Sequence, residues 1–206
     1  MRAIKQDERI EVATLLVRKP LEEWKQEDYV PKLDFIARDN FEDISDLKDR
    51  LMGYDAFFCT LGIEIKNGEE MFRKVDYQYP LNFAGLAKEC KVRYFGILTS
   101  QSSDPKSRIM YLRVKGEVEE AISKLELPIF GVFKPGLIMN RDNERTAEKI
   151  FSYVPFWPKI DARLLGKSMA EHAIEQLKTQ QNQHSVKFEL NNSQLLDYIK
   201  ERDLKI

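Results

Sequence analysis

Cysteine and histidine are both scarce in this sequence of 206 residues. The two cysteines, Cys59 and Cys90, are too few for a disulfide framework, and Cys59 lies in an apolar run that predicts a buried, reduced thiol. The two histidines, His172 and His184, have no metal-ligand spacing to either cysteine, so no metal site is predicted and both are interpreted as surface residues. A disulfide-stapled secreted domain and a zinc-dependent hydrolase are therefore disfavoured.

The sequence also has no long hydrophobic run and no excess of one charge. Apolar stretches such as 56–63 are far shorter than the roughly 20 residues that cross a bilayer, so no membrane span is predicted. Lys and Arg number 33 against 34 Asp and Glu, mixed along the chain, which argues against nucleic-acid binding. The first residues contain acids and no apolar secretory core, so we expect a cytoplasmic protein.

Short apolar runs alternate with longer stretches that carry apolar residues at three- and four-residue spacing. This alternation predicts one α/β domain over residues 1–206, with a Rossmann-like, doubly wound and mostly parallel sheet, because apolar runs of this kind suit strands covered on both faces. The segment after Pro135 is predicted to be largely irregular and to build a small substrate side. The predicted strands are 10–17, 32–37, 56–62, 92–100, 128–135 and 186–190, and the predicted helices are 45–52, 69–90, 105–125, 168–180 and 195–199.

Three residues in the middle of the chain suggest catalysis at the carboxyl end of the sheet, where ligands of such folds collect. Ser100 ends a predicted strand, and Tyr111 and Lys115 lie four residues apart, on one face of the following helix. A protonated lysine stabilises the phenolate of a nearby tyrosine, so the phenol can exchange a proton while Ser100 hydrogen-bonds the substrate oxygen. The Tyr-x-x-x-Lys spacing alone is weak, and the alternative is a solvent-facing helix pair. Its position one loop after Ser100 favours catalysis.

Residues after the other predicted strands suggest a dinucleotide cofactor. Arg18 and Lys19 suit a ribose 2′-phosphate and so favour NADP, or they are ordinary exposed loop residues. Asp39 can accept a hydrogen bond from adenine or can cap a helix. Gly62, after Leu61, permits close approach of the backbone to a cofactor, or it is a simple turn glycine.

Taken together, these residues resemble the short-chain dehydrogenase/reductase superfamily, and within it the atypical Tat-interacting-protein-like oxidoreductases. The resemblance implies catalytic roles for Ser100, Tyr111 and Lys115, with Lys115 also touching the nicotinamide ribose. It implies an NADP-dependent oxidoreductase acting on a small-molecule carbonyl or alcohol. In the same way it assigns the 2′-phosphate to Arg18 and Lys19, and the rest of NADP to Leu61, Gly62 and Leu137. The stretches that carry it are 15–20, 57–62, 72–89, 107–122 and 133–138.

The sequence departs from that family in two places. Asp76 stands where many members have an asparagine, which puts a water-mediated proton relay in doubt. No glycine precedes Gly53, so the usual first strand and the glycine-rich turn that binds pyrophosphate are missing, and residues 1–10 resemble only the end of the first helix. We therefore expect an N-terminally incomplete domain with exposed strand edges. The alternative function is a non-catalytic regulatory module that binds a protein partner.

Overall fold

Parallel strands and helices alternate along the chain, in a computed structural model that describes residues 1–140, 158–180 and 185–205. The strands are β1 (Val12–Val17), β2 (Lys32–Ala37), β3 (Ala56–Cys59), β4 (Tyr94–Leu98), β5 (Ile129–Lys134), β6 (Leu137–Met139), β7 (Lys159–Asp161) and β8 (Val186–Asn191). The helices are α1 (Lys48–Leu51), α2 (Glu69–Arg73), α3 (Tyr79–Glu89), α4 (Met110–Ser123), α6 (Ala162–Thr179) and α7 (Asn192–Glu201). Four 3-10 turns (Arg2–Ile4, Gln26–Asp28, Ser45–Leu47 and Ile65–Asn67) and a π-helical turn (Lys74–Gln78) complete them.

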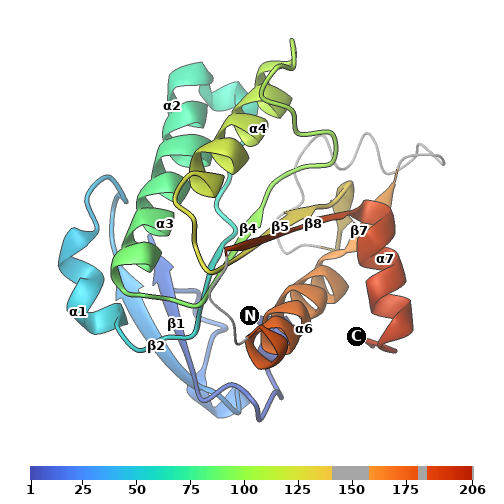
Figure 1. The fold of residues 1–206 in the computed structure, drawn as a ribbon. Coiled ribbons are helices and arrows are strands. Elements are labelled where there is room, and N and C mark those ends of the chain that lie inside the picture. The colour runs from blue at the N-terminus through green and yellow to red at the C-terminus, as the bar shows by residue number, and fades with distance from the viewer. Residues whose placement is uncertain (141–157, 181–184, 206) are drawn as a thin grey trace.

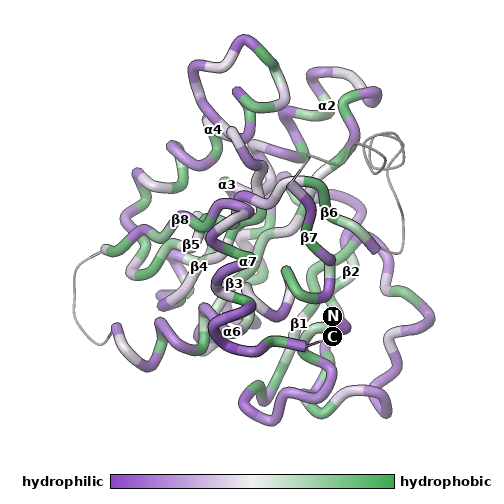
Figure 2. Tube along the Cα trace, turned by 90° about the vertical axis from the view of Figure 1, so that its right-hand side faces the viewer, coloured by the Kyte–Doolittle hydropathy of each residue, from purple (hydrophilic) through white to green (hydrophobic). Residues whose placement is uncertain are grey.

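A four-stranded parallel sheet in the order β3-β4-β5-β8 forms the centre of the molecule. Helices α2, α3 and α4 lie on one side of it and α6 on the other (Figure 1). The tube in Figure 2 is mostly hydrophobic along these central strands and hydrophilic around the outside. The predicted Rossmann-like, mostly parallel α/β fold is confirmed. Among the described residues, no helix is long and apolar enough to cross a membrane.

Two glycines opposite each other make room for aromatic rings within the sheet. Gly96 of β4 pairs in register with Gly131 of β5. A Cβ on Gly96 would lie 2.7 Å from the Phe58 ring, and one on Gly131 would collide with the Tyr94 hydroxyl. Tyr94 is fully buried and its hydroxyl therefore sits in the space that the glycine leaves.

Strands β1 and β2 form a separate two-stranded parallel sheet. Side chains join it to the central sheet, because the Thr14 hydroxyl hydrogen-bonds the Tyr54 hydroxyl and Ile36 lies in the same apolar core as Phe57. Within the described ranges, no strand pairs with the second edge of β1 or with the second edge of β3. The exposed edges expected from the sequence are thus present in the part of the chain that the structure describes.

The predicted long helix 69–90 is interrupted by the π-helical turn Lys74–Gln78. Pro80 has no N–H to donate to the carbonyl of Asp76 four residues earlier, and a widened turn is one way in which a helix accommodates this. Helix α6 begins earlier than predicted because Asp161 caps it, its Oδ1 accepting from the backbone N–H of Arg163 at 2.7 Å. The short strands β6 and β7 lie in the region predicted to be irregular.

His172 is buried, so its interpretation as a surface residue is wrong. It is 3% exposed on the face of α6 that covers the sheet, and its Nδ1 lies 2.9 Å from the Tyr94 hydroxyl. Rings of Phe133, Phe188 and Tyr198 surround it. The signal was in the sequence, since Leu165, Met169 and His172 recur at helical spacing. His184 lies outside the described residues.

Burial lowers the pKa of His172 to about 4 from an ordinary value of 6.5. Between these two pH values His172 is protonated in the unfolded chain and neutral in the folded chain. The free energy of unfolding therefore falls as the pH drops through this window, by at most about 3 kcal/mol. We expect His172→Phe to flatten this part of the curve of unfolding free energy against pH. Urea denaturation at a series of pH values measures it.

The control for this prediction is His184→Gln, which removes the other histidine and should leave the curve unchanged. A His172→Phe curve with the same slope as wild type between these two pKa values would contradict the prediction.

Candidate active site

Helix α4 carries the predicted catalytic pair Tyr111 and Lys115, one turn apart. Its Gly116 lies against the preceding loop, where a Cβ would collide with the backbone of Asp104 and Pro105. The Asp104 N–H also donates to the Leu112 carbonyl oxygen at 3.1 Å. These contacts fix the loop that follows β4 on the surface of α4, close to the start of the helix.

The Lys115 ammonium is buried in an ion pair with Asp76. The distance from Nζ to Oδ1 is 2.7 Å, and the two side chains are 7% and 1% exposed. The second carboxylate oxygen of Asp76 accepts the backbone N–H of Ile63 at 2.9 Å. Asp76 thus links α4 to the chain just beyond β3, where Leu61 and Gly62 lie. Lys115 is therefore not a solvent-facing residue, which was the alternative interpretation of the Tyr111 and Lys115 spacing.

Tyr111 is half-buried and packs its ring against Phe72 of α2. The ring centroids lie 5.6 Å apart with the planes tilted by 43°. Because Phe72 is fully buried, it gives the tyrosine a fixed apolar support. This contact and the position of Tyr111 on α4 determine where the phenol lies relative to the sheet.

Ser100 lies just after β4, in a turn made of serine and backbone groups. The Ser100 N–H donates to Ser103 Oγ at 3.2 Å, the Ser103 hydroxyl donates to the Ser100 carbonyl at 2.6 Å, and the Ser100 hydroxyl donates to the Gln101 carbonyl at 3.3 Å. The side-chain oxygens of its neighbours, Thr99 Oγ1 and Gln101 Oε1, are buried without a hydrogen-bond partner among the described residues. The end of β4 therefore holds buried polar atoms whose hydrogen bonds are not satisfied within the described residues.

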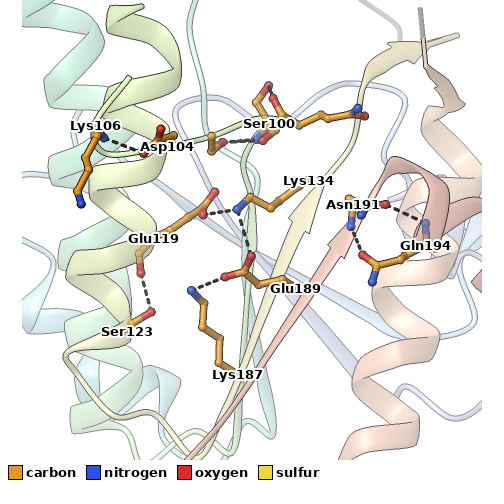
Figure 3. A network of polar contacts seen from close by, with 12 residues as sticks. Ser100, Asp104, Lys106, Glu119, Ser123, Lys134, Lys187, Glu189, Asn191 and Gln194 are labelled. Carbon is orange, nitrogen blue, oxygen red and sulfur yellow. Dashed lines mark hydrogen bonds and ion pairs between the residues drawn. The ribbon is translucent and has the colours of Figure 1, made fainter. Parts of the chain in front are cut away.

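A second ion pair, between Glu119 and Lys134, lies one helical turn beyond Lys115 on α4 (Figure 3). The sequence did not predict it. Lys134, at the end of β5, contacts Glu119 at 2.8 Å and Glu189 of β8 at 3.2 Å. Burial opposes the charge on Lys134, but these two carboxylates outweigh it and raise the pKa of the ammonium. The i, i+4 spacing of Lys115 and Glu119 was the available signal for two inward-facing charges.

The predicted cofactor residues lie in different parts of the structure. Arg18 and Lys19 are exposed directly after β1, and Asp39 is exposed after β2, where it caps no helix because the next helical turn begins at Ser45. Leu61 and Gly62 are half-buried after β3, and Leu137 begins β6. The structure brings Lys115 next to the β3 loop through Asp76, whereas Arg18, Lys19 and Asp39 belong to the separate β1-β2 sheet.

Cys59, the last residue of β3, is buried close to the Lys115–Asp76 pair. Burial raises the pKa of its thiol to about 11, although a hydrogen bond from the Leu61 backbone and the charge of Lys115 act in the opposite direction. The sequence prediction of a buried thiol is confirmed, and no disulfide forms because both cysteines are free.

Sequence comparison relates the chain to two groups of proteins. It is 35% identical over 122 residues to Protein HTATIP2 of Rattus norvegicus, covering 56% of this chain and 50% of that protein. It is 28% identical over 118 residues to Protein FMP52, mitochondrial, of Lodderomyces elongisporus, covering 55% and 49%. The chain therefore spans about half the length of these relatives. No known family profile matches it.

Solved structures of low sequence identity share the fold. MoeE5 in complex with UDP-glucuronic acid and NAD superposes with a TM-score of 0.65 at 11% identity, covering 86% of this chain and 67% of that one. UDP-N-acetylglucosamine 4-epimerase from Bacillus cereus gives 0.57 at 14%, covering 96% and 86%. These similarities establish the fold alone, and any chemistry has to be argued from the residues of the site.

One prediction is wrong by comparison. The sequence led us to expect a cytoplasmic protein, but the FMP52 relatives from three yeasts carry a mitochondrial name. The composition of the first residues therefore gave the wrong location.

Burial of both cysteines predicts that the native protein resists thiol reagents. The thiolate is the reactive form, and burial raises the pKa of Cys90 as well as that of Cys59. We expect no alkylation of the folded protein by iodoacetamide and double alkylation after denaturation, as measured by intact-mass spectrometry. Cys90→Ala assigns the sites, and labelling of native Cys59 at the rate of the denatured chain would contradict this account.

Proposed function

We propose that this chain is an NADP-dependent oxidoreductase. It is a relative of HTATIP2 and FMP52, and it has a Rossmann-like fold, as its sequence predicted. The reaction is hydride transfer to or from a carbonyl or alcohol substrate. Ser100, Tyr111 and Lys115 are the proposed catalytic residues.

The buried Lys115 ammonium is the observation that carries this proposal. The Lys115 side chain is only 7% exposed, whereas lysines on a protein surface keep their ammonium group in water. The cost of burying the Lys115 charge is offset by its ion pair with Asp76. Its position on α4 keeps it one helical turn from Tyr111 and beside the chain that leaves β3. A fixed positive charge at the carboxyl edge of a parallel sheet is what phenol acid-base chemistry requires.

The residues present fit two ends of a dinucleotide. The half-buried side chains of Ser100 and Tyr111, with the Lys115 ammonium, offer polar groups for a nicotinamide riboside beyond β4. Arg18 and Lys19 offer exposed positive charge for a 2′-phosphate. The residues given before Gly53 include no glycine, and we assign none of them to the pyrophosphate.

When bound, NADPH would supply hydride to the carbonyl carbon, and NADP⁺ would accept it from the alcohol in the reverse direction. The Ser100 hydroxyl donates a hydrogen bond to the substrate oxygen and polarises the carbonyl. Tyr111 donates the proton that this oxygen takes up, and Lys115 stabilises the phenolate that remains. In the direction of oxidation, the phenolate removes the proton from the alcohol.

Replacement of Tyr111 by Phe tests the chemistry. It removes the proton donor and retains the ring that packs on Phe72. We expect turnover to fall about 10²- to 10⁴-fold, the usual contribution of a general acid, with little change in the Kd for NADPH. Cofactor fluorescence measures the Kd, and NADPH consumption with a panel of aldehydes and ketones measures turnover.

Tyr77, half-buried on the neighbouring π-helical turn, gives the matched control Tyr77→Phe, which should retain both binding and turnover. Absence of any fluorescence change when wild-type protein is titrated into NADPH would refute the enzyme proposal for this chain.

A second function, a protein-interaction module, is favoured by the edges of β1 and β3 that no strand pairs within the described residues. Backbone groups on a free strand edge can pair with an extended segment of another protein. The carbonyls of Glu11 and Val17 accept hydrogen bonds from residues 32 and 38 beside β1. Because the backbone groups of successive strand residues alternate in direction, the N–H groups of Thr14 and Leu16 point away from β2. By the same alternation, the backbone N–H of Phe58 points away from β4.

We expect the amide protons of Thr14, Leu16 and Phe58 to exchange with solvent much faster than that of Gly131, which lies between two paired strands. Hydrogen exchange followed by NMR measures these rates. Equal protection at the two kinds of position would rule out an available edge, and with it the interaction function.

A further inference from the structure

We propose that Asp76 is a positioning residue that couples the Lys115 ammonium to the main chain leaving β3, so that the two move as one unit. This inference rests on the proposed function for its purpose, since both parts face the proposed cofactor. Nothing in the spacing of the catalytic residues pointed to it.

The two oxygens of the Asp76 carboxylate face different elements, one in an ion pair and the other in a hydrogen bond. Oδ1 lies 2.7 Å from Lys115 Nζ on α4, and Oδ2 accepts the Ile63 N–H at 2.9 Å beyond β3. Because Asp76 is 1% exposed, water does not compete for either contact. A carboxylate held in this way is a rigid bridge between a helix and a loop.

The π-helical turn directs Asp76 inward. Its charged neighbours do the opposite: Arg73 pairs with Glu117 and Lys74 pairs with Glu42, and the basic side chains of both pairs are about 40% exposed. Turns of this kind are frequent at functional sites, where they re-aim a single side chain. Here the side chain that is re-aimed is the partner of Lys115.

An aspartate serves this role better than an asparagine would. An amide can accept the Ile63 N–H, but it cannot neutralise a buried ammonium, which would otherwise bear the full cost of losing its hydration. The carboxylate therefore keeps Lys115 charged inside the protein and in one place.

The bridge is tested by changing Lys115 and measuring hydrogen exchange at the Ile63 amide, the other group that Asp76 holds. Lys115→Met does not touch Ile63, yet it removes the anchor of the carboxylate that holds the Ile63 N–H. We expect the hydrogen-exchange rate of the Ile63 amide to rise about tenfold. Lys115→Arg, which retains a charge, should retain most of the protection.

Glu119→Gln is the matched control, because Glu119 is also buried, lies on the same helix as Lys115 and pairs with a lysine of β5, Lys134. It should lower the melting temperature without altering exchange at Ile63. Asp76→Asn provides a second, isosteric variant should Lys115→Met fail to fold, and its weaker acceptor should raise Ile63 exchange several-fold. Unchanged Ile63 exchange in the Lys115→Met or Asp76→Asn protein would overturn the proposal.

Cofactor binding gives an independent readout that a purely structural residue would not move. We expect Asp76→Asn to weaken NADPH binding about tenfold more than Glu119→Gln. An equal effect in both would overturn the positioning role. If wild-type protein fails to bind NADPH, the oxidoreductase proposal fails, and the exchange rate of Ile63 still decides whether Asp76 couples the two elements.

Discussion

The buried ion pair between Lys115 and Asp76 is the constraint on which the rest of the site depends. Removing either partner would leave an uncompensated charge in the interior, a loss of about 3 to 5 kcal/mol in comparable cases. The pair joins α4, the π-helical turn and the chain beyond β3, three segments that are far apart in the sequence. The site is therefore a product of tertiary structure, although its individual residues were visible as a local motif.

The sheet beneath the site explains why α4 can carry charge into the interior. Strands β4 and β5 are almost completely buried, and their facing glycines, Gly96 and Gly131, admit the Phe58 and Tyr94 rings without separating the strands. Tyr94 then reaches His172 on α6, which closes the opposite face. The apolar contacts of this core give α4 and α6 fixed positions, so that a few polar contacts are enough to orient the side chains of the site.

The sequence predicted the strands and the type of sheet well, because buried parallel strands leave continuous apolar runs that depend on few other residues. It also placed Ser100, Tyr111 and Lys115 at the carboxyl edge or on the next helix. What it missed was set by partners distant in the chain: the inward turn of Asp76, the pairing of Glu119 with Lys134, and the burial of His172. Polar residues in a helical pattern look exposed until the neighbour that satisfies them is known.

Helix α4 presents two buried charges of opposite sign one turn apart, and each has a partner on a different element. Lys115 is held from the helical layer by Asp76, and Glu119 is held from the sheet by Lys134 (Figure 3). The two pairs balance, so the helix gains no net buried charge, and it cannot rotate or slide without breaking both. Within the described residues, the β1-β2 sheet is joined to the rest by apolar packing, by the hydroxyl pair of Thr14 and Tyr54, and by partly exposed ion pairs such as that of Asp34 with Arg50. The interior around α4 therefore holds paired charges, whereas Arg18 and Lys19 lie exposed after β1.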